Sequence, residues 1–189
     1  MSPNTRYVRA MWASLDLRCE SDQKLTEPMY RAAWLPGLTR VKTVLFLCTG
    51  NYYRSRFAEE LFNHRAAPAR INWHAKSRAL AIERGINNIG PLSPLVLWGL
   101  TTRGLSAKRA NRPPEQCIIL DLESADYVIA LNELEHRPLL NKRFPNWESR
   151  IQYWEIGDVE LMQPSKALAL IDAHVDALVA VFRDTQTAA

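Results

Sequence analysis

Cysteine is scarce in this chain of 189 residues, and long apolar runs are missing. The three cysteines, Cys19, Cys48 and Cys117, show neither the paired spacing of a disulfide framework nor the spacing of zinc ligands. No apolar run is long enough to cross a bilayer, and the first ten residues lack the apolar core of a secretory signal. We therefore expect a protein without bound metal or cofactor, away from membranes, in the reducing cytoplasm.

Sequence features of nucleic-acid binding are also missing, although the formal net charge is +4. Residues 1–42 hold seven Lys and Arg against four Asp and Glu, so most of the excess charge lies there. The rest of the chain is nearly neutral and carries no zinc-finger spacing, helicase loop or aromatic-basic repeat. We expect no nucleic-acid partner, and the sequence leaves the oligomeric state open.

What the chain does contain is an alternation of strands and helices after residue 42. Apolar periodicity predicts strands at 43–48, 71–77, 126–131 and 151–156. It predicts helices at 55–64, 93–102, 133–140 and 164–182, and a short one from Pro114. This order implies an α/β fold of three layers, a four-stranded parallel sheet with helices on both faces. Residues 43–189 would form this domain, and residues 1–42 a loosely ordered N-terminal extension.

Polarity along these elements predicts which side chains face solvent. In the helix 55–64, Glu59 and Glu60 are expected to face water, opposite an apolar face. The loop after residue 102 is expected to be solvated. It carries Lys108, Arg109 and Arg112. The helix from Pro114 is expected to turn three apolar residues inward: Ile118, Ile119 and Leu122.

The stretch Thr43–Phe62 combines a buried strand, a short polar loop and the start of a helix. Such a unit points backbone N–H groups and the positive end of a helix dipole at one place, which binds tetrahedral oxyanions. Cys48 begins the loop, where this field favours the thiolate. Arg54 follows six positions later with a planar fork of donors that suits phosphate. A cysteine ending a buried strand is also found as an inert core residue, so this spacing alone leaves both readings open.

Three other residues of the loop fit an anion cradle. Gly50 lets the backbone approach an anion closely, and Asn51 tolerates the left-handed conformation of a tight turn. Ser55 is placed to cap the helix and to steady a thiolate with its hydroxyl. The loop therefore has the composition of a nucleophile held inside an oxyanion site.

The segment C-T-G-N-Y-Y-R-S at residues 48–55 resembles the signature C-x-G-N-x-x-R-S of the low-molecular-weight protein tyrosine phosphatases. The signature is followed by x-x-A-E, and seven positions match in order: Cys48, Gly50, Asn51, Arg54, Ser55, Ala58 and Glu59. The resemblance implies the Rossmann-like fold of that family, with Cys48 as the nucleophile that becomes a phosphocysteine and Arg54 as the ligand of the phosphoryl oxygens. It implies a phosphate-binding loop made of Thr49, Gly50, Asn51, Tyr52, Tyr53, Arg54 and Ser55.

Two positions of this segment raise further expectations. Arg56 stands where the family usually has proline, and its presence is expected to loosen the first helical turn. The rings of Tyr52 and Tyr53 are expected to point outward to the rim, because the loop amides face the phosphate. Together with Trp154, which is equally suited to the core, they are candidates for a wall around an aromatic substrate.

The candidate general acid is Asp158, in the segment Y-W-E-I-G-D-V-E. A leaving oxygen needs a proton, and parallel strands end on the same side, so Asp158 should lie near the cysteine loop. Some bacterial members of the family resemble this chain here, with W-x-x-x-D, and by that resemblance Asp158 is the acid. Glu155 and Glu160 are the competitors, and a Gly-Asp pair also occurs as a plain turn.

Together these features predict a cysteine-dependent phosphomonoesterase that hydrolyses phosphotyrosine or similar aryl phosphates without a metal, with a phosphorylated protein or a small aryl phosphate as its partner. One alternative is a module that binds phosphate without turnover. Another is an arsenate reductase, whose relatives need two further cysteines after the strand 126–131, where this chain has none.

Overall fold

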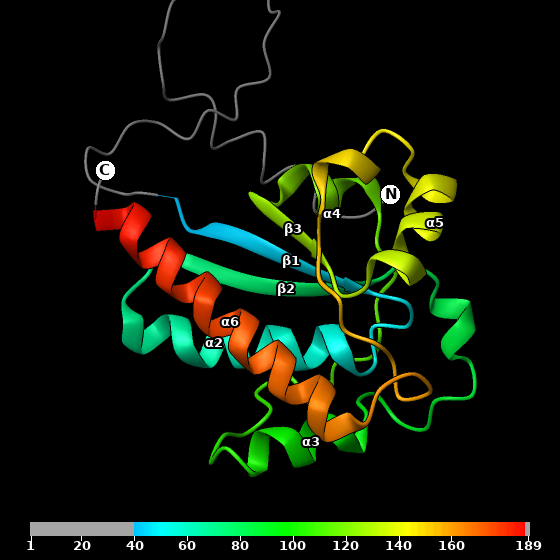
Figure 1. Ribbon diagram of the computed structural model, residues 1–189, viewed down its shortest axis with the longest axis horizontal. Coiled ribbons are helices and arrows are strands. Elements are labelled where there is room, and N and C mark those ends of the chain that lie inside the picture. The colour runs from blue at the N-terminus through cyan, green and yellow to red at the C-terminus, as the bar shows by residue number, and fades with distance from the viewer. Residues whose placement is uncertain (1–39, 188–189) are drawn as a thin grey trace, which may run out of the picture. The chain divides into compact units, whose positions relative to one another are not determined.

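Four parallel strands form the centre of residues 40–187, the part of the chain that the computed structural model describes (Figure 1). They are β1 Lys42–Cys48, β2 Trp73–Ala79, β3 Tyr127–Ala130 and β4 Gln152–Tyr153. The sheet order is β2-β1-β3-β4, and every pairing is parallel. The predicted four-stranded parallel sheet is confirmed. The predicted extension 1–42 lies almost wholly outside the described residues.

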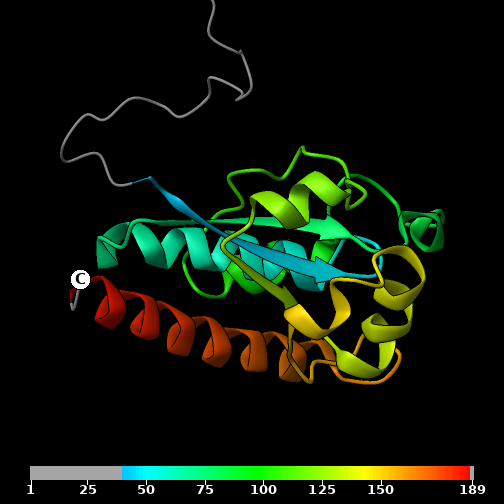
Figure 2. The same cartoon turned by 90° about the horizontal axis from the view of Figure 1, so that it is seen from above.

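Helices cover both faces of this sheet. On one face lie α2 Arg54–Ala69, α3 Pro94–Thr101 and α6 Pro164–Thr187. On the other face lie α4 Ile119–Ser124 and α5 Glu133–Arg143. Two 3-10 turns, Ile82–Gly85 and Glu148–Arg150, sit in the connections. Figure 1 shows α2 and α6 side by side beneath the sheet, and in the turned view of Figure 2 α6 runs along the strands.

The apolar run of β1 supplies both halves of the core. Val44 and Phe46 pack with the helices α2, α3 and α6. Leu45 and Leu47 point to the opposite face and pack with α4 and α5. Alternate residues of one strand therefore enter two clusters, which explains why the strand reads as continuously apolar. Trp154 belongs to the first cluster, with its ring 5.5 Å from that of Phe46, so it is a core residue and no part of a substrate wall.

The structure corrects the predicted helix from Pro114. Gln116 extends the sheet instead, because it forms a parallel bridge with Ala79, the last residue of β2. The helix α4 therefore begins only at Ile119. Of the three residues expected to point inward, Leu122 is buried, whereas Ile118 and Ile119 are 53% and 43% exposed. Among the described residues, no helix is both long and apolar enough to cross a membrane.

A glycine allows α3 to pack closely against the core. A Cβ at Gly99 would lie 2.6 Å from Cδ1 of Leu168 and 3.0 Å from the ring of Phe57. Both side chains are buried, so little space is available for them to move.

We predict that Gly99→Ala destabilises the protein by about 1 kcal/mol, because overpacking outweighs the gain in helix propensity. The measurement is urea unfolding followed by circular dichroism. Thr101→Ala, at an exposed position of the same helix, is the control and should leave the midpoint unchanged or slightly raised. A rise in stability for Gly99→Ala would show that the side chains of Leu168 and Phe57 can move aside at little cost.

Candidate active site

The candidate site lies where three neighbouring strands end. The amide of Leu131 donates to the carbonyl of Leu47, and the amide of Ile156 donates to that of Leu131. The segments that follow β1, β3 and β4 therefore leave the sheet at the same edge, as ligand sites of parallel sheets require. They enclose a cavity of about 570 Å³. Its lining includes Cys48, Tyr52, Tyr53, Arg54, Glu135 and Asp158.

The carbonyl groups of the loop 48–53 are bonded on its outer side. The carbonyls of Cys48 and Thr49 accept the amides of Leu80 and Ala81, and that of Tyr52 accepts the amide of Ser93. Because C=O and N–H of one peptide point in opposite directions, the amides that follow these carbonyls turn away from those partners. This orientation is the one that an oxyanion cradle requires.

Cys48 is buried, and the side chains around its sulfur are polar. Its Sγ lies 3.0 Å from Oγ of Ser55, which also accepts a 3.1 Å hydrogen bond from Nδ2 of Asn51. Asn51 has a φ of 51°, so the predicted left-handed conformation is confirmed. Asn51 and Ser55 together fix the sulfur at the bottom of the loop. A Cβ at Gly50 would make only ordinary contacts, so protein packing alone does not demand glycine there.

Arg54 is 1% exposed, and its two terminal nitrogens are fully engaged. Nη1 donates to Oε2 of Glu135 at 2.7 Å and to the carbonyl of Ile156 at 3.0 Å. Nη2 donates to Oε1 of Glu135 at 2.8 Å and to Oδ2 of Asp158 at 2.7 Å. A guanidinium buried in this way is fixed in plane and direction by partners that follow two other strands, β3 and β4.

The sequence analysis missed Glu135, although it binds Arg54 with both oxygens. It lies three residues after Asn132, whose side chain caps α5 and accepts the amide of Glu135. Thr49 also donates its hydroxyl to Glu135. Burial opposes its ionisation, but the adjacent ring of His136 and the hydrogen bonds from Arg54 prevail and hold the pKa of Glu135 far below its usual range. The sequence offered one signal for Glu135: an acidic residue in the first turn of the helix that follows β3, the strand beside β1.

Asp158 follows β4 and reaches the cavity, as the order of the strands predicted. Its side chain is 39% exposed, and besides Arg54 it accepts the amide of Val159 at 2.8 Å. The preceding Gly157 packs closely against the turn 161–162, where a Cβ would meet two side chains at 3.2 Å. Glycine at this position therefore allows the turn to pack closely. Of the competing carboxylates, Glu160 lines the cavity and Glu155 does not.

One of the two tyrosines of the loop, Tyr53, differs from the prediction. Tyr52 is partly exposed, and its hydroxyl donates to the carbonyl of Ile89 at 2.7 Å. Tyr53 is buried, with its hydroxyl 3.4 Å from the carbonyl of Pro164. Burial and the neighbouring Asp158 raise the pKa of Tyr53 to about 12. Only Tyr52 therefore stands at the rim.

Comparison with known proteins identifies the family. The model of the family described as low molecular weight phosphotyrosine protein phosphatase matches residues 43–158. This chain belongs to the low molecular weight phosphotyrosine protein phosphatase family. None of the curated proteins matches it.

Solved structures show the same fold at low identity. YfkJ from Bacillus subtilis is 23% identical, with a TM-score of 0.68 over 79% of this chain and 99% of that one. A low molecular weight protein tyrosine phosphatase from T. tengcongensis is 24% identical, with a TM-score of 0.61 over 74% and 98%. The YwlE arginine phosphatase from Geobacillus stearothermophilus is 20% identical, with a TM-score of 0.62 over 77% and 96%. The neighbours thus include phosphatases named for tyrosine and for arginine.

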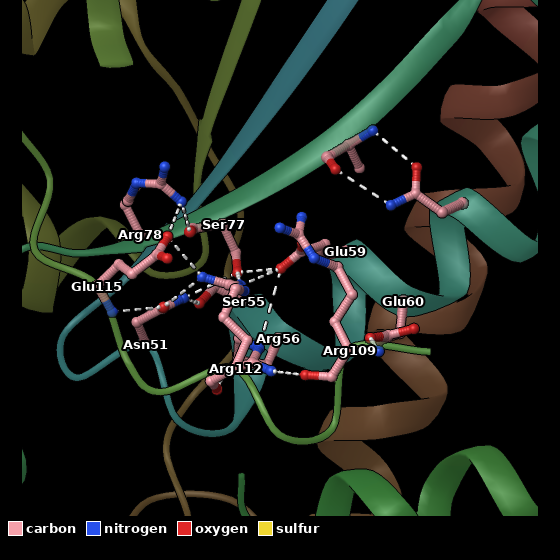
Figure 3. Close-up of polar contacts among 12 residues, drawn as sticks. Asn51, Ser55, Arg56, Glu59, Glu60, Ser77, Arg78, Arg109, Arg112 and Glu115 are labelled. Carbon is pink, nitrogen blue, oxygen red and sulfur yellow. Dashed lines mark hydrogen bonds and ion pairs between the residues drawn. The ribbon is translucent and has the colours of Figure 1, made fainter. Parts of the chain in front are cut away.

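In this phosphatase a buried ionic cluster lies behind the loop, centred on Glu59 (Figure 3). Oε2 of Glu59 accepts Nη2 of Arg112 at 2.6 Å, Oε1 accepts Nη1 of Arg109 at 3.1 Å, and Arg56 lies 3.9 Å away. Ser77 donates to Glu59 at 2.5 Å and accepts Nδ2 of Asn51 at 2.8 Å, which joins the cluster to the loop. The expectation that Glu59 faces water is wrong.

The same cluster explains the other misplaced side chains. Glu60 is 2% exposed, because its carboxylate accepts the amides of Lys108 and Arg109 at 3.0 and 2.8 Å. Arg56 is fully buried and donates to the carbonyls of Arg109 and Arg112 at 2.7 and 2.8 Å. Arg56 thus binds the segment after α3 to the first turn of α2. That segment is bound to α2 at these points. Lys108 and Arg109 are nevertheless exposed, as predicted, whereas the side chain of Arg112 is only 9% exposed.

We predict that Glu59→Gln lowers the free energy of unfolding by about 3 kcal/mol, because it leaves buried guanidinium groups without their carboxylate. Urea unfolding measures the change. The matched control is Glu123→Gln on the exposed side of α4, which should change stability by less than about 0.5 kcal/mol. Equal midpoints for the two variants would contradict a compensated buried cluster.

Proposed function

We propose that the protein hydrolyses phosphate monoesters through a phosphocysteine, with phosphotyrosine or a similar aryl phosphate as substrate. The observation that carries the proposal is that Cys48, Arg54 and Asp158 line one cavity at the ends of neighbouring strands. Membership of the phosphatase family supports it. A phosphorylated protein or small aryl phosphate is the partner that this function requires.

In the first half-reaction the thiolate of Cys48 attacks phosphorus, and the bond from phosphorus to the leaving oxygen breaks. Arg54 and the loop amides donate to the phosphoryl oxygens as charge spreads over them. The phosphate oxygens replace Asp158 on Arg54, and the carboxyl of Asp158 gives its proton to the leaving oxygen. In the second half-reaction water attacks phosphorus, Asp158 takes its proton, and the sulfur–phosphorus bond breaks to release inorganic phosphate.

The walls of the cavity support a flat, apolar leaving group. Tyr52, Leu95, Val159 and Leu161 all line it. Val159 and Leu161 are 48% and 80% exposed, so their side chains are available to a bound ring.

Phosphoarginine is a second candidate substrate. The likeness to an arginine phosphatase suggests this substrate. Glu160 supports it, because a carboxylate at the cavity suits a guanidinium leaving group. Parallel assays with phosphotyrosine and phosphoarginine peptides distinguish the two, since the true substrate class should show the higher kcat/KM.

An arsenate reductase needs a thiol relay, which the described cysteines do not support. In the sheet, the backbone of Cys48 pairs with that of Ala79, and Ala79 pairs with Gln116. The Cα atoms of Cys48 and Cys117 are therefore about two inter-strand spacings, roughly 10 Å, apart. A disulfide spans at most about 7 Å between Cα atoms. Burial and the nearby Asp121 also raise the pKa of Cys117 to about 12, which keeps its thiol protonated.

We predict that Cys48→Ser abolishes hydrolysis of p-nitrophenyl phosphate, which the wild type should cleave in the presence of a chelator. Serine is a far weaker nucleophile at neutral pH, so kcat should fall by at least about a thousandfold. Undiminished turnover by the variant would remove Cys48 from its role. Tight phosphate or vanadate binding without any turnover in the wild type would instead indicate a binding module.

We predict that Asp158→Asn lowers kcat for phosphotyrosine by about 100-fold, because asparagine has no proton to give. For p-nitrophenyl phosphate the loss should be smaller, since nitrophenolate leaves readily without protonation. The control is Glu155→Gln, an exposed carboxylate outside the cavity, which should keep wild-type rates. An equal loss for both substrates would argue against Asp158 as the general acid.

A further inference from the structure

We propose that Glu135 is a positioning residue of the reaction, which holds the guanidinium of Arg54 toward the phosphate-binding loop in every step. This inference rests on the proposed function. The carboxylate of Glu135 binds the reacting arginine, although Glu135 is not among the residues that match the family motif.

The contacts of Arg54 distinguish a fixed partner from an exchangeable one. Glu135 binds Nη1 and Nη2 at 2.7 and 2.8 Å, whereas Asp158 binds Nη2 alone. Two parallel hydrogen bonds fix the plane of a guanidinium, and a single bond does not. Glu135 is therefore the partner that sets the direction of Arg54, and Asp158 is the partner that a phosphate oxygen replaces.

The anchoring of the two carboxylates points the same way. Glu135 lies in the first turn of α5, where Asn132 caps its amide and Thr49 donates to its carboxylate. Its side chain is 23% exposed, against 39% for that of Asp158 in its loop. The contact with Thr49 also joins α5 directly to the loop that would hold the phosphate. One carboxylate thus fixes both the loop and its arginine.

His136 adds a further restraint next to Glu135. It is fully buried, and its Nδ1 accepts the amide of Asn132 at 2.9 Å, which leaves the ring proton on Nε2. Nε2 lies 3.6 Å from Oε1 of Glu135 and has no hydrogen-bond partner within the described part of the chain. The ring therefore faces the carboxylate and limits the positions that Glu135 can take.

A held arginine matters most in the transition state. Arginine has a long side chain with many rotamers, and a partner that removes this freedom beforehand spares the reaction that entropy cost. Misplacement of a catalytic group by about 1 Å costs on the order of 100-fold in rate. Glu135 also places a negative charge near the phosphate, so it should add nothing to ground-state binding. A positioning role therefore predicts an effect on kcat without a matching effect on KM.

The test compares Glu135→Gln and Glu135→Ala with the control Glu133→Gln. Glu133 lies in the same first turn of α5, but it pairs with Arg137 instead of Arg54. With p-nitrophenyl phosphate, both Glu135 variants should lose about 10- to 100-fold in kcat with little change in KM. The control should match the wild type. Circular dichroism and thermal unfolding verify that all variants fold.

Binding of two oxyanions supplies a readout that does not depend on turnover. Vanadate resembles the pentavalent transition state, so its affinity should fall with kcat in both Glu135 variants. Affinity for inorganic phosphate should stay constant or rise, because a like charge is removed. Were the wild type inactive, the proposed function would fail, and the loss or retention of vanadate affinity would still decide the role of Glu135.

Two results would overturn the inference. In the first, kcat and vanadate affinity of both Glu135 variants stay within twofold of the wild type. In the second, the variants turn over faster and bind phosphate more tightly. Glu135 would then be a competitor of the substrate for Arg54, not the residue that positions it.

Discussion

The structure depends on one buried charge, the guanidinium of Arg54. A fully buried cation without partners would cost several kcal/mol, so the fold must bring acceptors to it. It does so from two other strand ends: Glu135 follows β3, while Ile156 and Asp158 follow β4. The parallel order β2-β1-β3-β4 makes this possible, because β1 and β3 are neighbours and end at the same edge. The strand order of the sheet is therefore also what assembles the site.

A second ionic group lies on the other side of the same loop and prepares it for an anion. Glu59 contacts three arginines, and Ser77 links it to Asn51 by hydrogen bonds to both residues. The first two turns of α2 therefore carry buried charges, Arg56, Glu59 and Glu60, beside buried apolar side chains. With its supports in place before a ligand arrives, the loop has little reorganisation left to perform, which is the condition for strong electrostatic catalysis.

The sequence predicted the parts of this protein that depend on local patterns. The strand-loop-helix stretch and the left-handed Asn51 follow from residues close together in the chain. The failures share a cause as well. Glu59 was placed in water because its charge looked solvated, yet Arg109 and Arg112 meet it from about fifty residues away. Ion pairs between distant segments leave no periodic trace in either segment.

The pairing of Arg54 with Glu135 also bears on how the site attracts phosphate. A guanidinium whose charge is already balanced contributes directed hydrogen bonds more than net attraction. Attraction for the anion must then come mostly from the loop amides and the amino end of α2, which are neutral donors with a positive field. Such a site distinguishes the shape of a phosphoryl group more than its charge. Weaker net attraction should also ease the release of inorganic phosphate, which the proposed hydrolysis requires after every turnover.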